Sequence, residues 1–189
     1  MRSVVFDIET VQIRPGSFDA DNMEMTICCT YDSATDAYDS FLKEDLPRLW
    51  QLFEQADAVV GYNSDHFDIP VLNKYYPGDL AKIRSIDLMK DIQAALGRRI
   101  KLDLVAEGTL SAKKSGHGSQ AGVWWRKGDI DSLRKYCLKD VELTKRLFDY
   151  MRDNGSVKYK ELGKTHEIKV DTAHWLAQEA RPLTFTLGF

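Results

Sequence analysis

The stretch SVVFDIE, residues 3–9, decides the fold, because its β-branched and aromatic residues favour a buried strand that ends in carboxylates. Successive side chains of a strand point to opposite faces, so Asp7 and Glu9 would lie on one face and Ile8 on the other. Both carboxylates can therefore reach a single site. Alone, the same pattern is also typical of a solvated strand end.

The pattern that follows this strand indicates an α/β fold. Two further strands, 24–31 and 36–42, are separated by turn formers and predict a three-stranded antiparallel meander. An amphipathic helix over 43–56 then leads to a buried strand at 57–61, as in a crossover between parallel strands. The other expected elements are a helix with Asp68 as its N-cap, a strand at 83–86, helices at 87–96 and 102–110, a mobile loop at 114–122, a long helix at 129–152, a hairpin at 157–171 and an irregular tail.

Length and composition indicate one domain. The chain has 189 residues, of which 43% are hydrophobic, enough for one sizeable core. We expect a single domain over 1–189, with a core over about 3–150 and a C-terminal hairpin and tail over 156–189. No apolar run approaches the roughly 18 residues of a membrane span, and no signal-peptide pattern is visible, so a cytoplasmic protein is expected. Three cysteines without zinc-site spacing are expected to be reduced core residues: Cys28, Cys29 and Cys137.

The charge pattern leaves nucleic-acid binding open. A net charge of −3 provides no basic footprint of the kind that nucleic-acid-binding proteins usually carry. The stretch from Arg98 to Lys127, however, holds seven basic residues against two acidic ones, Asp103 and Glu107, and is locally +5. This stretch is either a phosphate track or a set of solvated helix faces and loops.

Two further patterns place polar groups where they could join the first pair. Asp68, in the segment 61–70, follows a buried strand at the start of a helix, a position where α/β proteins bind ligands but where an aspartate also simply caps a helix. Tyr136 and Asp140 are four apart and share one face of the long helix. Each pattern alone is weakly informative, but chance rarely supplies all three in this order.

At this point the chain resembles the DEDDy subgroup of the DnaQ-like 3′ to 5′ exonucleases. The resemblance covers about residues 3–150. Within it, the segment 61–72 is especially similar to family B polymerase proofreading domains and to their free-standing bacterial and phage relatives. The sister subgroup has a histidine where this chain has Lys135, which favours the tyrosine subgroup. The matching segments are FDIET (6–10), GYNSDHFDIPVL (61–72) and YCLKDVELT (136–144).

The resemblance implies a ribonuclease H-like mixed β-sheet flanked by helices, with Asp7, Glu9, Asp68 and Asp140 as metal ligands. Four clustered carboxylates repel one another unless cations neutralise them, and oxygen ligands favour Mg²⁺ or Mn²⁺. Two ions would activate water and stabilise the leaving oxygen. By resemblance, Asp7 would bridge both ions, Glu9 and Asp140 would complete the site that activates water, and Asp68 would hold the second ion. Tyr136 would orient the water, since a pKa of about 10 makes tyrosine a poor base.

Neighbouring residues are candidates for substrate binding, each with a structural alternative. Asn63 would hold the turn or contact substrate, and Asp65 could replace Asp68 as a ligand, although the resemblance aligns the aspartate after Phe67. The adjacent Trp124 and Trp125 could stack bases, although core packing of at least one is favoured. His66 and His117 are expected to be solvated. The candidate substrate contacts are Thr10, Asn63, Trp125 and Arg126.

Three functions follow from these features. The first is an exonuclease acting on the 3′ end of a single strand, with DNA favoured over RNA. The second is a catalytically silent nucleic-acid-binding module with the same fold, and the third is an endonuclease, in which Tyr136 has no evident purpose. Because no polymerase segment is visible in the 189 residues, proofreading would need a separate polymerase or repair protein as partner.

Overall fold

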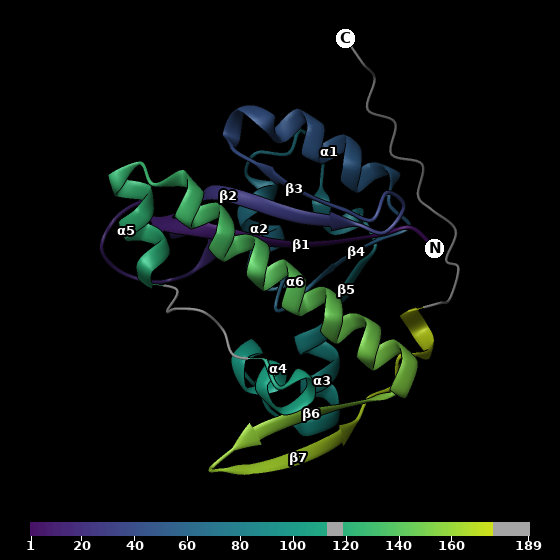
Figure 1. Ribbon diagram of the computed structural model, residues 1–189. Helices are drawn as coiled ribbons and strands as arrows, with labels where there is room; N and C mark the ends of the chain where they lie inside the picture. Colours follow the sequence, from purple (N-terminus) through teal and green to yellow (C-terminus); the bar gives the residue numbers. More distant parts are fainter. Residues whose placement is uncertain (113–118, 176–189) are drawn as a thin grey trace.

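Five strands form the central sheet of the computed structural model, which describes residues 1–112 and 119–175 (Figure 1). Their order is β3-β2-β1-β4-β5. β1 pairs antiparallel with β2 and parallel with β4, and β4 pairs parallel with β5, so the sheet is mixed. The strands are β1 (Ser3–Gln12), β2 (Met23–Asp32), β3 (Ala37–Phe41), β4 (Ala58–Gly61) and β5 (Ser85–Asp87).

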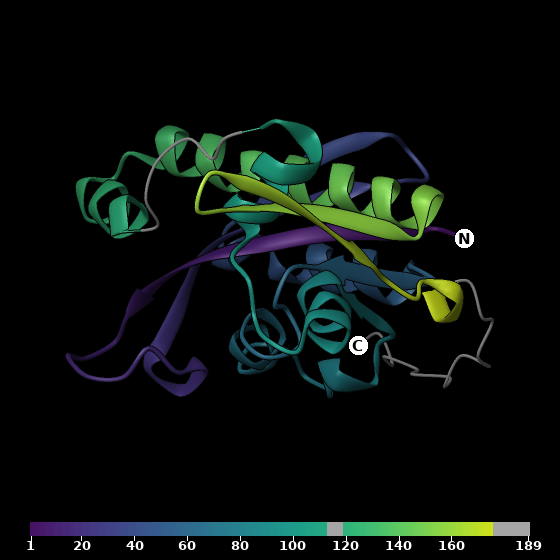
Figure 2. The same cartoon turned by 90° about the horizontal axis from the view of Figure 1, so that it is seen from below.

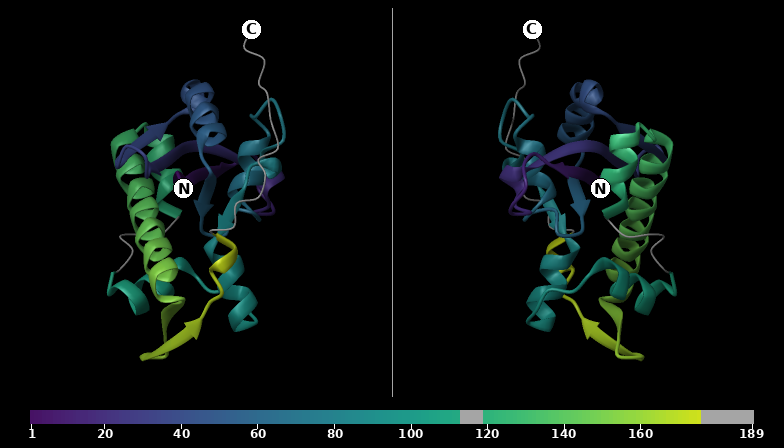
Figure 3. Two further views of the ribbon diagram at one scale, coloured as in Figure 1. Left: turned by 90° about the vertical axis from the view of Figure 1, so that its right-hand side faces the viewer. Right: turned by 90° about the vertical axis from the view of Figure 1, so that its left-hand side faces the viewer.

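Helices cover both faces of this sheet, as Figure 3 shows from two sides. The apolar side chains of β1 alternate between two cores: Val4 and Phe6 join a cluster with α1 and α2, and Val5 joins a cluster with α3, α4 and α6. β1 therefore lies in the middle of the molecule. The helices are α1 (Leu46–Gln55), α2 (Asp68–Asn73), α3 (Leu88–Leu96), α4 (Leu102–Leu110), α5 (Ser119–Lys127) and α6 (Ile130–Asn154), with 3₁₀ turns at Ala20–Asn22, Lys43–Asp45, Leu80–Lys82 and Ala173–Trp175.

The helix α6 crosses one face of the sheet along its length and packs on β1 and β2 (Figure 1). Its start is set by Asp129, whose side chain accepts a hydrogen bond from the Ser132 amide. Its end is set by Gly155, whose φ of +59° is the left-handed conformation that terminates helices. One apolar stripe on this helix faces the sheet, which places the residues of that stripe over β1.

A two-stranded hairpin, β6 (Ser156–Glu161) and β7 (Lys164–Lys169), follows α6 and packs against α4 (Figure 2). Thr109 in α4 joins the two elements, because its hydroxyl oxygen donates to the Lys158 carbonyl at 2.6 Å and accepts from the Lys158 amide at 2.9 Å. The hairpin thereby adds Val157, Tyr159 and Ile168 to the core cluster that also contains residues of α4 and α6.

The expected order of elements is confirmed, with two corrections. The loop expected at 114–122 is wrong for residues 119–122, which begin α5; residues 113–118, with His117, lie outside the described part. Asp68 is the first residue of α2 rather than its N-cap, which is Phe67, because the Asp68 carboxylate bonds elsewhere. The expected irregular tail contains a 3₁₀ turn at Ala173–Trp175, and residues 176–189 lie outside the described part.

The reduced, buried state expected of the three cysteines is confirmed, since all three are free and buried. None of the helices in the described ranges combines the length and the apolar character that crossing a membrane requires.

Candidate metal centre

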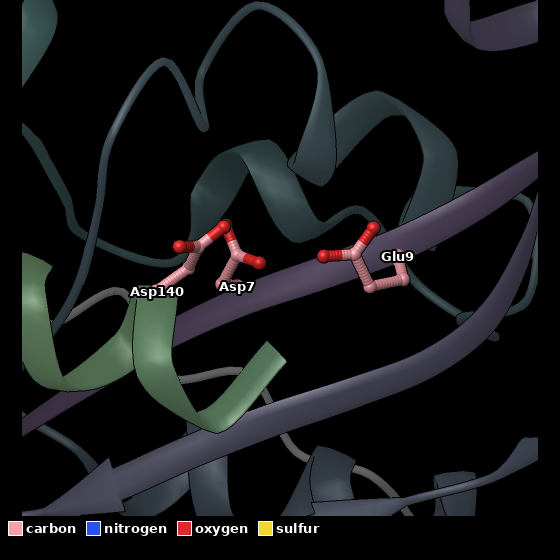
Figure 4. Close-up of side chains that lie close together, drawn as sticks. All are labelled: Asp7, Glu9 and Asp140. Atoms are coloured by element: carbon pink, nitrogen blue, oxygen red, sulfur yellow. The ribbon is translucent and has the colours of Figure 1, made fainter. Parts of the chain in front are cut away.

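Three carboxylates from distant parts of the chain meet over the middle of the sheet. Asp7 and Glu9 on β1 and Asp140 on α6 each place an oxygen within 4.8 Å of the others (Figure 4). Glu9 and Asp140 are only 8% and 3% exposed, and Asp7 is half-buried. Negative groups gathered this closely in a low-dielectric interior favour a bound cation, and their hard oxygens suit Mg²⁺ or Mn²⁺. The donor set therefore fits a divalent ion.

The strand alternation that places Val5 under α6 also places Asp7 and Glu9 there. The pairing of β1 with β2 shifts immediately after Glu9, so that Thr26 becomes an extra residue in β2. Thr26 donates from its hydroxyl to the Glu9 carbonyl at 2.9 Å and anchors this bulge. A bulge increases the local twist of a strand and re-aims its side chains, and this one lies directly beside Glu9.

The helix α6 contributes more than Asp140 to this site. Tyr136 lies one turn earlier, is 4% exposed, and has its ring 5.6 Å from the ring of Trp124 in α5. The Cys137 thiol donates to the Asp7 carbonyl at 3.4 Å, with its sulfur 3.9 Å from the Asp7 Oδ2 atom. Burial raises the pKa of Cys137 well above its ordinary value, which keeps this thiol a donor.

Asp68 lies beside the three carboxylates but outside the group whose oxygens are within 4.8 Å. β4 pairs with β1 only as far as Val5, so the amide of Ile8 has no strand partner on that side, and Asp68 Oδ1 accepts from it at 3.3 Å. Burial raises the pKa of Asp68 to about 7, while the bond from Ile8 opposes this shift. The structure thus brings Asp68 to the backbone between Asp7 and Glu9.

The turn before α2 is held by Asp87, a residue that the sequence analysis did not single out. Its Oδ1 accepts from the Asn63 amide at 2.7 Å, and its Oδ2 accepts from the Asp65 amide at 3.1 Å. Asn63 has a φ of +66°, a left-handed conformation that asparagine tolerates better than most residues. The sequence feature that could have indicated Asp87 is its position between a strand and a helix. There its carboxylate also caps α3 by accepting from the Met89 amide.

Of the neighbours considered as alternatives, Asp65 forms an ion pair with Lys90 at 2.9 Å and His66 is exposed, as expected for a surface histidine. Both Trp124 and Trp125 are half-buried and pack against the core beneath α6, so the expectation that at least one would pack is confirmed.

The other candidate substrate contacts occupy different settings. Thr10 is half-buried at the bulge, and Arg126 is exposed at the end of α5. Asn63 both shapes its turn and lines a groove described below. Substrate contact by Thr10, Asn63, Trp125 and Arg126 stays a prediction.

A mixed five-stranded sheet flanked by helices, with an acidic group able to hold a divalent ion at its centre, defines the class of ribonuclease H-like α/β proteins. Residues 4–153 match the RNase H superfamily, and the chain belongs to that superfamily. No curated protein matches the chain.

Among solved structures, the family B DNA polymerase from the hyperthermophilic archaeon Pyrobaculum calidifontis is similar to this chain, with a TM-score of 0.61 and 21% sequence identity. The match covers 80% of this chain but 24% of the polymerase chain, so this chain spans about a quarter of that protein. At 21% sequence identity, this similarity indicates a shared fold.

Proposed function

We propose that this chain is a metal-dependent 3′ to 5′ exonuclease that hydrolyses single-stranded nucleic acid with two divalent ions. The observation that carries the proposal is the convergence of Asp7 and Glu9 from β1 with Asp140 from α6. A purely structural role would have no use for three carboxylates held this close together, because like charges in a low-dielectric interior raise one another's free energy. A site that holds cations accounts for all three.

Each side chain then has a distinct role. Asp7, Glu9 and Asp140 would hold the ions, and Asp68 would approach them from the open edge of β1. Bound Mg²⁺ or Mn²⁺ supplies a nucleophilic water at neutral pH and offsets charge on the phosphodiester. Tyr136 orients that water by hydrogen bonding.

The exonuclease activity and the 3′ end are supported by the three segments that resemble the DEDDy subgroup, and nuclease chemistry by membership of the RNase H superfamily. DNA is the favoured substrate and RNA the second. The structural likeness to a polymerase is consistent with action beside a separate polymerase or repair protein. We propose a single exonuclease domain, in which the hairpin β6–β7 supports α4.

Digestion of a 5′-labelled single strand with and without Mn²⁺ tests this function. A ladder of shortening products that needs Mn²⁺, and that disappears in Asp7→Asn, is the expected result. Internal cuts would instead indicate an endonuclease. An intact substrate that is only retarded on a gel would indicate a silent binding module.

Metal binding is tested separately by the melting temperature, Tm. An ion that binds the folded site and not the unfolded chain raises the free energy of unfolding, by about 2.7 kcal/mol when its concentration is 100 times Kd. The Tm rises as a result. Mn²⁺ should raise the Tm of the wild type, and Asp7→Ala should remove most of that rise. Asp131→Ala is the control, because the Asp131 side chain is 82% exposed at the start of α6. An equal rise in the wild type and Asp7→Ala would contradict the site.

A further inference from the structure

A groove of about 670 Å³ lies against the turn that leads into α2. One wall is formed by this turn and includes Phe67, and the other by the segment between α3 and α4, with Arg99, Ile100 and Lys101. Phe18, from the connection between β1 and β2, completes the lining. Tyr62 fixes the two walls together, since its hydroxyl donates to the Ile100 carbonyl at 2.8 Å.

We propose that this groove binds the single strand on the 5′ side of the scissile bond, with Arg99 and Lys101 on its phosphates and Phe18 stacked on a base. The inference rests on the proposed exonuclease function and adds the residues that recognise the strand. It requires three things of the groove: free positive charge, an exposed aromatic face, and a position beside the acidic group.

The charge requirement is met by two basic residues that keep their charge directed to solvent. Arg99 and Lys101 are exposed, and no ion pair between described residues involves either of them. Arg99 donates to the side-chain carbonyl of Asn63, a neutral partner that leaves its charge uncompensated. Asp103 also lines the groove, but the two cations outnumber it. Exposed cations beside an apolar wall suit a phosphate backbone.

The neighbouring Arg98, in contrast to Arg99, has a structural role. Its guanidinium forms an ion pair with Glu161 at 2.7 Å and lies 5.7 Å from the centre of the Tyr159 ring, both on the hairpin β6–β7. Adjacent arginines therefore have opposite roles: Arg98 attaches the hairpin, whereas Arg99 faces the groove.

The aromatic requirement is met by Phe18, a residue that is 73% exposed. Among the described residues Phe18 is the most exposed aromatic one, and because it lines the groove its ring is accessible for stacking. Phe67 and Ile100 add apolar surface on the walls. Bases of any sequence can stack on such a surface, because each has a π-face.

The position of the groove relative to the acidic group follows from the chain. Phe67 in the wall directly precedes Asp68, whose carboxylate accepts from the Ile8 amide between Asp7 and Glu9. The groove volume of about 670 Å³ lies in the range of ligand pockets, and the segment from Arg99 to Asp103 lines it together with Phe67. A strand with its 3′ end at the carboxylates would thus place its preceding nucleotides in this groove.

The test compares two substrates in the presence of Mn²⁺: an oligothymidylate, and the p-nitrophenyl ester of thymidine 5′-monophosphate, which is too small to reach the groove. In the double variant Arg99→Gln, Lys101→Gln, the ratio of kcat/KM for the oligonucleotide to kcat/KM for the ester should fall at least tenfold, through KM. Since each single-strand phosphate contact contributes a slope of about 0.7, the dependence of log KM on log salt should flatten by about 1.4. Phe18→Ala should lower the same ratio by about tenfold without flattening the salt dependence.

Arg98→Gln is the matched control and should leave the ratio unchanged. An unchanged ratio in the double variant, or an equal loss with both substrates, would overturn the groove assignment while the wild type still cleaves. If the wild type cleaves neither substrate, the proposed exonuclease function itself fails.

Discussion

Glu9 and Asp140 are buried carboxylates, and burial removes the water that would otherwise stabilise their charged forms. The fold nevertheless holds them against Asp7, which adds repulsion to the cost of burial. Residues that break a rule of protein stability in this way are commonly retained for function. The Cys137 thiol donates to the Asp7 carbonyl and thereby joins β1 to α6 beside the carboxylates.

Under the proposed function, a substitution of Tyr136 would affect hydrolysis but not ion binding. Tyr136→Phe keeps the ring that packs on Trp124 and removes only the hydroxyl. We expect kcat to fall by a factor on the order of 10², while the Mn²⁺-induced rise in Tm persists. Tyr150→Phe is the control, because Tyr150 lies 14 residues later in α6, about 21 Å away. Full activity in Tyr136→Phe would remove the hydroxyl from the mechanism.

At the scale of elements, α4 packs so closely on the hairpin that only glycine fits at position 108. A Cβ atom added to Gly108 would lie 2.5 Å from the Tyr159 Cα atom. Gly108→Ala should therefore lower the free energy of unfolding by about 1–2 kcal/mol, although helix propensity alone would raise it by about 1 kcal/mol. Chemical denaturation measures the difference.

The control is a second helical glycine, Gly122 in α5, where an added Cβ would meet the flexible side chain of Arg126 at 3.3 Å. Gly122→Ala should be neutral or stabilising, because that side chain can move. If Gly108→Ala proves as stable as Gly122→Ala, the hairpin does not dock on α4 as closely as described.

Elements with a strong local pattern could be predicted from the sequence, whereas those decided by packing could not. β1 and α6 carry clear periodicity, so the positions of Asp7, Glu9 and Asp140 followed from it. α5 was missed because the sequence before it is rich in glycine and serine and Gly122 near its start is a poor helix former, both of which favour a loop. The packing of Trp124 and Trp125 on the core stabilises the helix. The contact of Asp68 with Ile8 depends on where β4 ends, which local sequence does not encode.

At the scale of the whole molecule, the two ends of β1 serve different purposes. The part of β1 after Val5 carries Asp7 and Glu9. There β4 no longer pairs with β1, and the Asp68 carboxylate bonds to the exposed edge of β1 instead. At the N-terminal end of β1, the Arg2 side chain forms hydrogen bonds with Asp32 at the end of β2 and with Gln55 at the end of α1. About 23 Å of strand separates Arg2 from Glu9. Stability and catalysis should therefore respond to different substitutions.

Arg2→Gln tests this separation. The two hydrogen bonds from Arg2 hold the pKa of Asp32 below its ordinary value. Their contribution to the free energy of unfolding is therefore complete above a pH of about 4 and is lost as the pH falls through the lowered pKa. At pH 7 the variant should lose about 1.5 kcal/mol, or about 3–6 °C in Tm, with kcat unchanged. Below pH 3 the gap to wild type should narrow. Arg48→Gln, at a pair whose side chains are 60% and 50% exposed, should cost less at every pH. A gap that stays constant with pH would show that Asp32 ionisation does not stabilise this end of the sheet.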